Sequence, residues 1–108
     1  MEIDAVLPRQ FLTEIVDPSH AGEARRVAVE LAESVGFNQT DRGKIAIAVT
    51  EMATNLVKHA QHGKLLYEPV RHNGSVGVRV LALDKGPGIR NVSEALQDGY
   101  STYGSSGN

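Results

Sequence analysis

The sequence predicts an α+β fold in which two helices pack on one face of a mostly antiparallel sheet. Two segments, residues 17–35 and 40–61, carry apolar side chains at helical spacing. Residues 10–16, 65–70 and 75–84 have strand character, and an Asn-Gly pair between the last two is typical of a hairpin turn. The order strand, helix, helix, strand, strand favours a two-layer α/β sandwich.

The composition limits the classes of protein to which the chain can belong. Its 108 residues fit one domain, with 41% hydrophobic and 22% charged residues. A net charge of −2 gives no basic surface for nucleic acid, and no apolar run is long enough to cross a membrane. There is no cysteine, and the acidic N-terminus lacks the apolar region of a secretory signal. We therefore predict a cytoplasmic domain.

The first half of the chain has clear helix boundaries. Asp17 can cap a helix whose first position suits Pro18, and Gly36 is suited to end it after Val35. Thr40 or Asp41 should cap the second helix, which runs to about Gln61. Its apolar face consists of Ile45, Val49, Met52 and Leu56.

The second half has a strong strand signal followed by a weaker pattern. In residues 65–70, Pro69 suggests an edge strand or an early end. In residues 75–84, Asp84 continues an inward-facing row of small apolar side chains, where a carboxylate needs a partner. Val92, Ala95 and Leu96 are spaced for a short helix over residues 91–97. Residues 98–108 have the Gly- and Ser-rich composition of a loop or tail.

A polar stripe on the second helix is the first candidate site. Glu51, Asn55 and Lys58 project within about 60° of one another on a helix. Such a stripe can be a solvated surface. Alternatively, a carboxamide oxygen suits Mg²⁺ with nucleotide phosphates, the carboxylate could accept a proton from a water or hydroxyl group, and the amine could reach a phosphate.

The second candidate site is the segment Asp84-Lys85-Gly86-Pro87-Gly88-Ile89. Its carboxylate could accept a hydrogen bond from the amino group of adenine, and its glycines let a ring approach the backbone. The same residues also suit a plain strand-to-turn transition. His59 and His62 could contribute to a metal site, but no third ligand stands at recognisable spacing. A packing role for His59 is the simpler interpretation.

Together these two segments resemble the GHKL, or Bergerat-fold, superfamily of histidine kinase-like ATPases. Glu51-x-x-x-Asn55-x-x-x-His59 is similar to its N box, and Asp84-x-Gly86-x-Gly88 is similar to its first glycine box. More specifically, the chain resembles the bacterial anti-sigma-factor serine kinases of the RsbT/RsbW type. Three segments carry this match: Thr50-Glu51-Met52-Ala53-Thr54-Asn55, Ala82-Leu83-Asp84-Lys85-Gly86-Pro87-Gly88-Ile89 and Asp98-Gly99-Tyr100-Ser101-Thr102. The resemblance runs from about Phe11 to Asn108.

The resemblance implies a role for each matched residue. Asn55 would ligate Mg²⁺, Glu51 would be the general base, and Asp84 would bind adenine in a pocket shaped by Gly86 and Gly88. Residues 90–108 would form the lid over ATP. The remaining nucleotide contacts would come from Lys58, His59, Ile89, Ser101 and Thr102.

The resemblance also implies a function and partners. The chain would bind ATP and Mg²⁺ and phosphorylate a serine or threonine of an anti-sigma antagonist (STAS-type) protein. Alternatively, it would be a non-catalytic, nucleotide-gated module that binds a sigma factor or phosphatase, or the ATP-binding part of a longer phosphatase regulator. In the family a second glycine turn and two strands follow the lid, so we expect the sequence to stop short of them. The exposed sheet edge could then pair with another chain, for example with a second copy in a homodimer.

Overall fold

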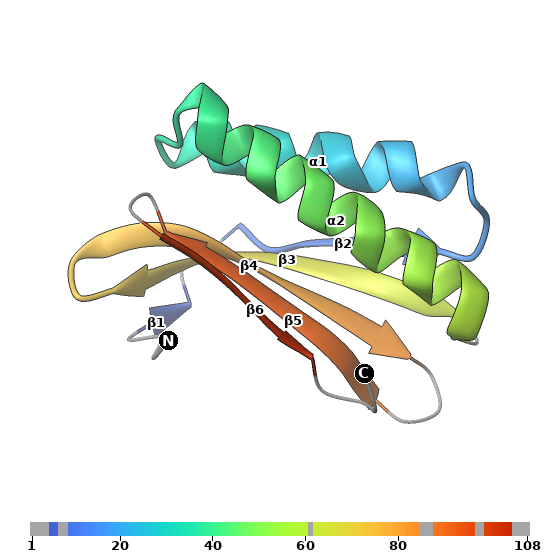
Figure 1. Ribbon diagram of the computed structural model, residues 1–108. Coiled ribbons are helices and arrows are strands. Elements are labelled where there is room, and N and C mark those ends of the chain that lie inside the picture. Colours follow the sequence, from blue (N-terminus) through green and yellow to red (C-terminus); the bar gives the residue numbers. More distant parts are fainter. Residues whose placement is uncertain (1–4, 7–8, 61, 85–87, 97–98, 105–108) are drawn as a thin grey trace.

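A computed structural model shows two helices on one face of a six-stranded antiparallel sheet (Figure 1). It describes residues 5–6, 9–60, 62–84, 88–96 and 99–104, and in 5–6, 88–96 and 99–104 it describes the backbone. This arrangement confirms the predicted α+β sandwich.

Helix α1 spans His20–Ser34 and follows a tight turn after the strand Phe11–Ile15. The Oδ1 atom of Asp17 accepts a hydrogen bond from the Ser19 amide at 2.9 Å, and this bond holds the pKa of Asp17 below its usual value. The Nδ1 atom of His20 accepts from the amides of Val16 and Asp17, at 3.1 and 3.3 Å. Asp17 therefore forms the turn before the helix, whose cap is Ser19, so the prediction of Asp17 as the cap and of Pro18 at the first helical position was wrong. Gly36 follows the helix with φ 96°, as predicted.

Helix α2 spans Gln39–His59, so it starts before the predicted cap and ends two residues before the predicted end at Gln61. Its cap is Asn38, whose Oδ1 accepts from the Asp41 amide at 2.8 Å, so the prediction of Thr40 or Asp41 as the cap was wrong. Thr40 and Asp41 lie inside the first turn, where Asp41 faces the positive end of the helix dipole.

The sheet is centred on two long strands, β3 (Gly63–His72) and β4 (Ser75–Asp84). They form a hairpin around Asn73 and Gly74, whose φ angles of 50° and 82° suit the predicted Asn-Gly turn. On its other edge β3 pairs with both β1 (Ala5–Val6) and β2 (Phe11–Ile15). Beyond β4 lie β5 (Gly88–Leu96) and β6 (Gly99–Gly104), and all the pairs are antiparallel.

Pro69 lies inside β3 and does not end it. The outer edge of β3 pairs with β2 through residues 63–67 and with β1 through Val70 and Arg71. Pro69 falls in the gap between the two partners, where its missing amide hydrogen costs the sheet least. The suggestion of an early strand end was therefore wrong.

Residues 91–97 were expected to form a short helix, and this prediction was wrong. Residues 88–96 form β5 and pair with β4, and residues 99–104 form β6 where a loop or tail was expected. The helical spacing of Val92, Ala95 and Leu96 covers too few residues to distinguish helix from strand. Pairing with the exposed edge of β4 determines the outcome.

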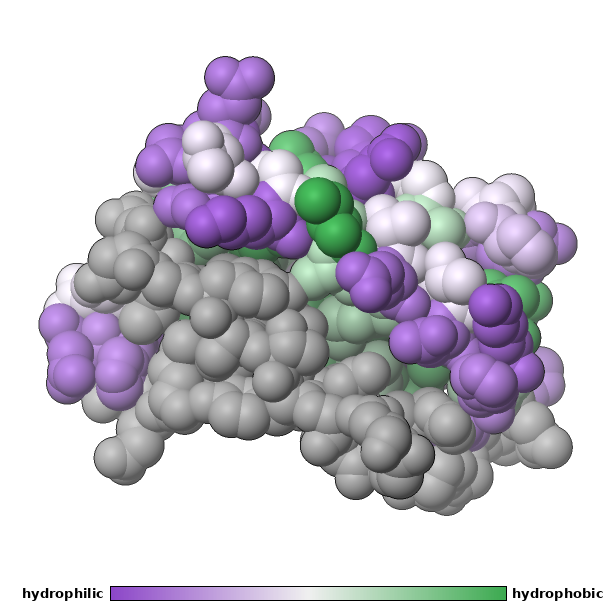
Figure 2. All heavy atoms as spheres, viewed as in Figure 1, coloured by the Kyte–Doolittle hydropathy of each residue, from purple (hydrophilic) through white to green (hydrophobic). Residues whose placement is uncertain are grey.

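The core lies between the helices and the sheet face they cover. It consists mainly of Ala, Val, Leu and Ile side chains from both the helices and the sheet. Phe37 and the fully buried Tyr67 are its aromatic members. The hydroxyl group of Tyr67 shares a 2.8 Å hydrogen bond with Thr13. The face of the helix layer that points away from the sheet has a mainly hydrophilic surface (Figure 2). Within the described ranges, no helix combines the length and apolar character that crossing a membrane requires.

Candidate functional site

Three segments that carry candidate residues meet at one end of the sandwich (Figure 1). Helix α2 ends at His59, the chain turns, and β3 begins at Gly63. Leu83, next to the last residue of β4, pairs with Lys64 at the start of β3. The end of α2 and the end of β4 are therefore neighbours, although about 25 residues separate them in the sequence.

Gly63 makes this turn possible. A Cβ atom at Gly63 would lie 3.0 Å from Leu56 Cδ2 on α2 and 3.2 Å from the carbonyl oxygen of Ile15 on β2. The preceding residue, His62, has a φ angle of 54°, in the left-handed region that is costly for most side chains. A small residue here lets α2 turn directly into β3.

The polar stripe is exposed along α2, as the helical spacing predicts. Glu51, Asn55 and Lys58 are all exposed, and among the described residues none of these side chains forms a hydrogen bond or ion pair. The neighbouring hydroxyl groups differ: Thr50 donates to the Ala46 carbonyl at 2.7 Å and Thr54 to the Thr50 carbonyl at 2.9 Å. The stripe thus offers a carboxylate, a carboxamide and an amine that are not engaged by the described fold.

Asp84 is the buried member of the candidate set. It ends β4 with 7% of its surface exposed and continues the inward-facing row of Val78, Val80 and Ala82. Because residues two apart on a strand share a face, the start of its side chain lies on the helix-covered side of the sheet. The prediction of an inward-facing carboxylate at the strand end is confirmed.

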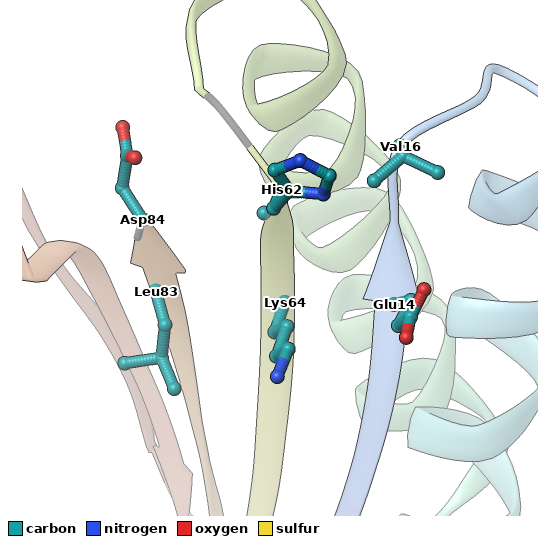
Figure 3. A pocket seen from close by; sticks show the side chains of 7 residues that line it. Glu14, Val16, His62, Lys64, Leu83 and Asp84 are labelled. Atoms are coloured by element: carbon teal, nitrogen blue, oxygen red, sulfur yellow. The ribbon is translucent and has the colours of Figure 1, made fainter. Parts of the chain in front are cut away.

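A pocket of about 400 Å³ lies at the same end of the sheet (Figure 3). Glu14, Lys64 and Leu83 stand side by side on adjacent strands, because the register pairs Glu14 with Lys64 and Lys64 with Leu83. These side chains alternate with the core residues, so they lie on the face away from the helices. The remaining lining residues are Val16, His62, Gly63 and Asp84.

Among the described residues that line the pocket, Asp84 and His62 were named as candidates from the sequence. Asp84 lines it, whereas Glu51, Asn55, Lys58 and His59 lie outside it on α2. Gly86 is outside the described residues, and Gly88, Ile89, Ser101 and Thr102 are placed only as backbone positions of β5 and β6. No sequence pattern indicated Glu14 or Lys64, because only the register of three strands brings these residues close to Asp84.

His59, His62 and Asn55 are the side chains that the sequence offers as candidate metal ligands. His59 is exposed, so the packing interpretation was wrong. Within the described ranges no three His, Cys, Asp or Glu side chains cluster as a metal site. An exposed Asn55 is compatible with Mg²⁺ even without such a cluster, because that ion usually takes one or two protein ligands and completes its shell with phosphate oxygens and water.

Comparisons with known proteins support the resemblance found in the sequence. Residues 16–107 match the family described as the histidine kinase-like ATPase domain. The chain is 34% identical over 84 residues to the serine/threonine-protein kinase RsbT of Bacillus subtilis (strain 168). That alignment covers 78% of this chain and 63% of the relative. The matched family region includes both the stripe on α2 and Asp84.

Proposed function

Because the chain belongs to the histidine kinase-like ATPase domain family, we propose that it binds Mg·ATP and phosphorylates a serine or threonine of a partner protein. The observation that carries the proposal is the position of the two candidate segments. The unengaged stripe on α2 and the buried Asp84 lie at the same end of the sandwich, and both fall within the region that matches the family. The similarity to a serine/threonine kinase favours protein phosphorylation over simple ATP hydrolysis.

Each group has a role that its chemistry allows. The Asp84 carboxylate would accept a hydrogen bond from the exocyclic amine of adenine, which guanine lacks at that position. Lys58 would provide a positive charge for the phosphates. Asn55 would hold Mg²⁺, an ion that neutralises phosphate charge when bound. Glycines 86 and 88, together with Ile89, Ser101 and Thr102, would complete the nucleotide site beneath a lid formed by residues 90–108.

Glu51 would act on the protein substrate. Its carboxylate would accept the proton of the attacking hydroxyl group while that oxygen forms a bond to the γ-phosphorus. The bond between the γ-phosphorus and the bridging oxygen breaks, and its electron pair leaves with ADP. Because Glu51 and Asn55 are one helical turn apart on the same face, the proton acceptor would stand beside the bound phosphates.

The proposed partner is an anti-sigma antagonist of the STAS type, and the proposed setting is the cytoplasm, where ATP is available. The chain spans 63% of the length of the RsbT relative, so the activity of a whole kinase is a proposal here. A nucleotide-gated module without catalysis would use the same ATP site to hold a sigma factor or a phosphatase.

Titration calorimetry with Mg·ATP tests the nucleotide site. We expect Asp84→Asn and Asn55→Ala each to weaken binding at least about tenfold, which corresponds to roughly 1.4 kcal/mol. Asp84→Asn should also reduce the preference for ATP over GTP. Lys58→Ala should weaken binding, whereas Lys44→Ala, an exposed lysine on the same helix, is the matched control. Unchanged affinity in both the Asp84 and Asn55 variants would refute the assignment.

Transfer of labelled γ-phosphate to a purified STAS-type antagonist separates a kinase from a binding module. We expect Glu51→Gln to lower the transfer rate by a factor of about 10² to 10⁴, while ATP and partner binding stay intact. The control is Glu30→Gln, which removes an exposed carboxylate from α1. If Glu51→Gln leaves the transfer rate unchanged, or if the wild type transfers no phosphate while binding both ligands, the kinase assignment is wrong.

A further inference from the structure

An isoleucine stands exposed in the middle of the polar face of helix α2. Ile47 is 65% exposed, more than Phe11, Leu12 or Val16, the other exposed large apolar side chains of the described residues. It shares a face with Glu51, which follows four residues later on the helix. Figure 2 shows an apolar spot among the hydrophilic side chains of this helix. A single exposed apolar residue is ordinary on a protein surface, so its neighbours decide its significance.

The first informative neighbour is a glycine one turn before Ile47 on the same face. Gly43 is exposed inside α2, where glycine is less favourable than alanine because it loses more backbone freedom on folding. A Cβ atom at Gly43 would have nothing within 4 Å, and its φ angle is not positive. In the described part of the chain, neither packing nor backbone conformation therefore requires glycine here. Its effect is to leave the helix backbone bare beside an exposed apolar side chain.

The second informative neighbour is a lysine whose charge the described fold does not use. Lys44 precedes Ile47 by three residues, is exposed, and forms no hydrogen bond or ion pair among the described residues. Arg42 differs, because it donates to Glu33 at 3.3 Å and to the Phe37 carbonyl at 3.4 Å. An acidic group that approached Ile47 would therefore meet an unengaged positive charge.

The position of Ile47 relative to Glu51 indicates what lies over it. Asn55, the proposed Mg²⁺ ligand, is one turn beyond Glu51, whereas Ile47 is one turn before it on the same face. The nucleotide phosphates thus approach Glu51 from one side. The side that remains for the protein that supplies the hydroxyl group is the side of Ile47.

We propose that Gly43, Lys44 and Ile47 form the surface on which the phosphate-accepting protein docks, and we call these three residues the docking turn. Ile47 packs against an apolar side chain that lies about 6 Å from the accepting hydroxyl group, the rise of four helical residues. Gly43 lets the partner come close to the helix backbone, and Lys44 attracts an acidic residue. This inference rests on the proposed function. It adds that the accepting surface presents a hydroxyl, an apolar and an acidic side chain in that order.

Other occupants fit the docking turn less well. Nucleotide phosphates need charged or polar contacts, and Asn55 and Lys58 offer these on the opposite side of Glu51. A purely acidic partner would gain from Lys44 but not from an exposed isoleucine. A protein surface that combines apolar and acidic side chains satisfies both.

Phosphate transfer to a purified STAS-type antagonist, measured over a range of antagonist concentrations, tests the docking turn. We expect Ile47→Ser to raise KM for the antagonist at least about tenfold, while kcat and the affinity for Mg·ATP stay unchanged. Ile47→Leu should keep a KM close to that of the wild type. The matched control is Leu12→Ser, because Leu12 is 55% exposed on the face of the sheet away from the helices. An unchanged KM in Ile47→Ser overturns the proposal, and so does a weaker affinity for Mg·ATP, which would assign Ile47 to the nucleotide site.

A larger side chain at Gly43 separates docking from folding. Leucine forms helices better than glycine, so Gly43→Leu should leave the free energy of unfolding at least as high as in the wild type. It should nevertheless raise KM for the antagonist at least about tenfold, because the new side chain holds the partner away from the helix. The matched control is Gly22→Leu on α1, since a Cβ atom at Gly22 also has nothing within 4 Å. Equal changes in KM for the two variants overturn the proposal.

Charge reversal tests the contact with an acidic residue. Lys44→Glu should raise KM for the antagonist about fivefold at low salt, and added salt should reduce the difference from the wild type. Arg71→Glu is the control, because Arg71 is exposed near the end of β3, away from α2. Equal effects of the two reversals overturn the role of Lys44.

Direct binding separates the docking turn from the proposed catalysis. Titration calorimetry measures the affinity of the antagonist for the chain in the presence of a non-hydrolysable ATP analogue. If the wild type binds the antagonist but transfers no phosphate, the kinase assignment fails, while an affinity reduced at least about tenfold in Ile47→Ser supports the docking turn. If the wild type transfers phosphate and Ile47→Ser binds the antagonist as tightly as the wild type, the docking turn is wrong and the kinase assignment stands. A wild type that does not bind the antagonist overturns both.

Discussion

Replacing Tyr67 by phenylalanine should make the protein less stable at neutral pH and more stable than the wild type at strongly alkaline pH. Tyr67 is fully buried, and its hydroxyl group shares a 2.8 Å hydrogen bond with Thr13. The substitution removes this bond and leaves the partly buried hydroxyl group of Thr13 without its partner. At pH 7 the expected loss in the free energy of unfolding is about 1–2 kcal/mol.

The reversal follows from the ionisation of the buried phenol. Burial raises the pKa of Tyr67 to about 12, compared with 10.0 for an exposed tyrosine. The stability associated with the protonated phenol is fully present below pH 10 and is lost as the pH rises through 12, because the unfolded chain ionises first. A shift of two pKa units is worth roughly 2.7 kcal/mol, of which about 2 kcal/mol is lost by pH 12. The stability curves of wild type and Tyr67→Phe should therefore cross near pH 11.

Urea unfolding followed by far-ultraviolet circular dichroism, at several pH values from neutral to alkaline, measures this difference directly. Thr13→Val is the control, since it removes the same hydrogen bond but keeps the buried phenol. It should be destabilised at neutral pH and should retain the alkaline loss of stability. A stability difference between wild type and Tyr67→Phe that stays constant from neutral to alkaline pH would refute the reasoning.

Two further substitutions test the packing and charges around the site by urea unfolding. Gly63→Ala should cost about 1–3 kcal/mol, because its Cβ would meet Leu56 at 3.0 Å. The same change at Gly43, an exposed helical position with nothing within 4 Å, should instead stabilise by up to about 1 kcal/mol, and equal effects would contradict the close contact. Glu68→Leu should cost about 2–4 kcal/mol, because it leaves Arg79 without its buried partner, and the double change of Glu68 and Arg79 to leucine should recover most of that loss. A double variant no more stable than the single one would contradict the account.

The sequence predicted the parts of the fold that depend on local chemistry. Asn73 and Gly74 formed the expected hairpin because both tolerate positive φ, and the strict alternation in residues 75–84 assigned each side chain of β4 to its correct face. Asp84 could be recognised as inward-facing for the same reason. Those features are determined by neighbours in the chain, so sequence patterns reveal them.

The errors arose where distant parts of the chain decide the outcome. Residues 91–97 fit a helix on spacing alone, but β4 offered an edge with which they pair as β5. The pocket shows the same limit, because Glu14 and Lys64 reach Asp84 through a register between three strands. The role of residues 90–108 as a lid stays a prediction, since for 88–96 and 99–104 the structure gives strand backbone alone.

The proposed nucleotide site lies in the helix layer and on the helix-covered face of the sheet, and this placement has a testable consequence. Glu51 and Asn55 are exposed on α2, and Asp84 starts on the helix-covered face of β4, whereas Leu12 is 55% exposed on the other face of the sheet. Leu12→Lys should therefore leave the affinity for Mg·ATP unchanged in titration calorimetry. A loss of affinity in this variant would contradict the separation seen in the fold.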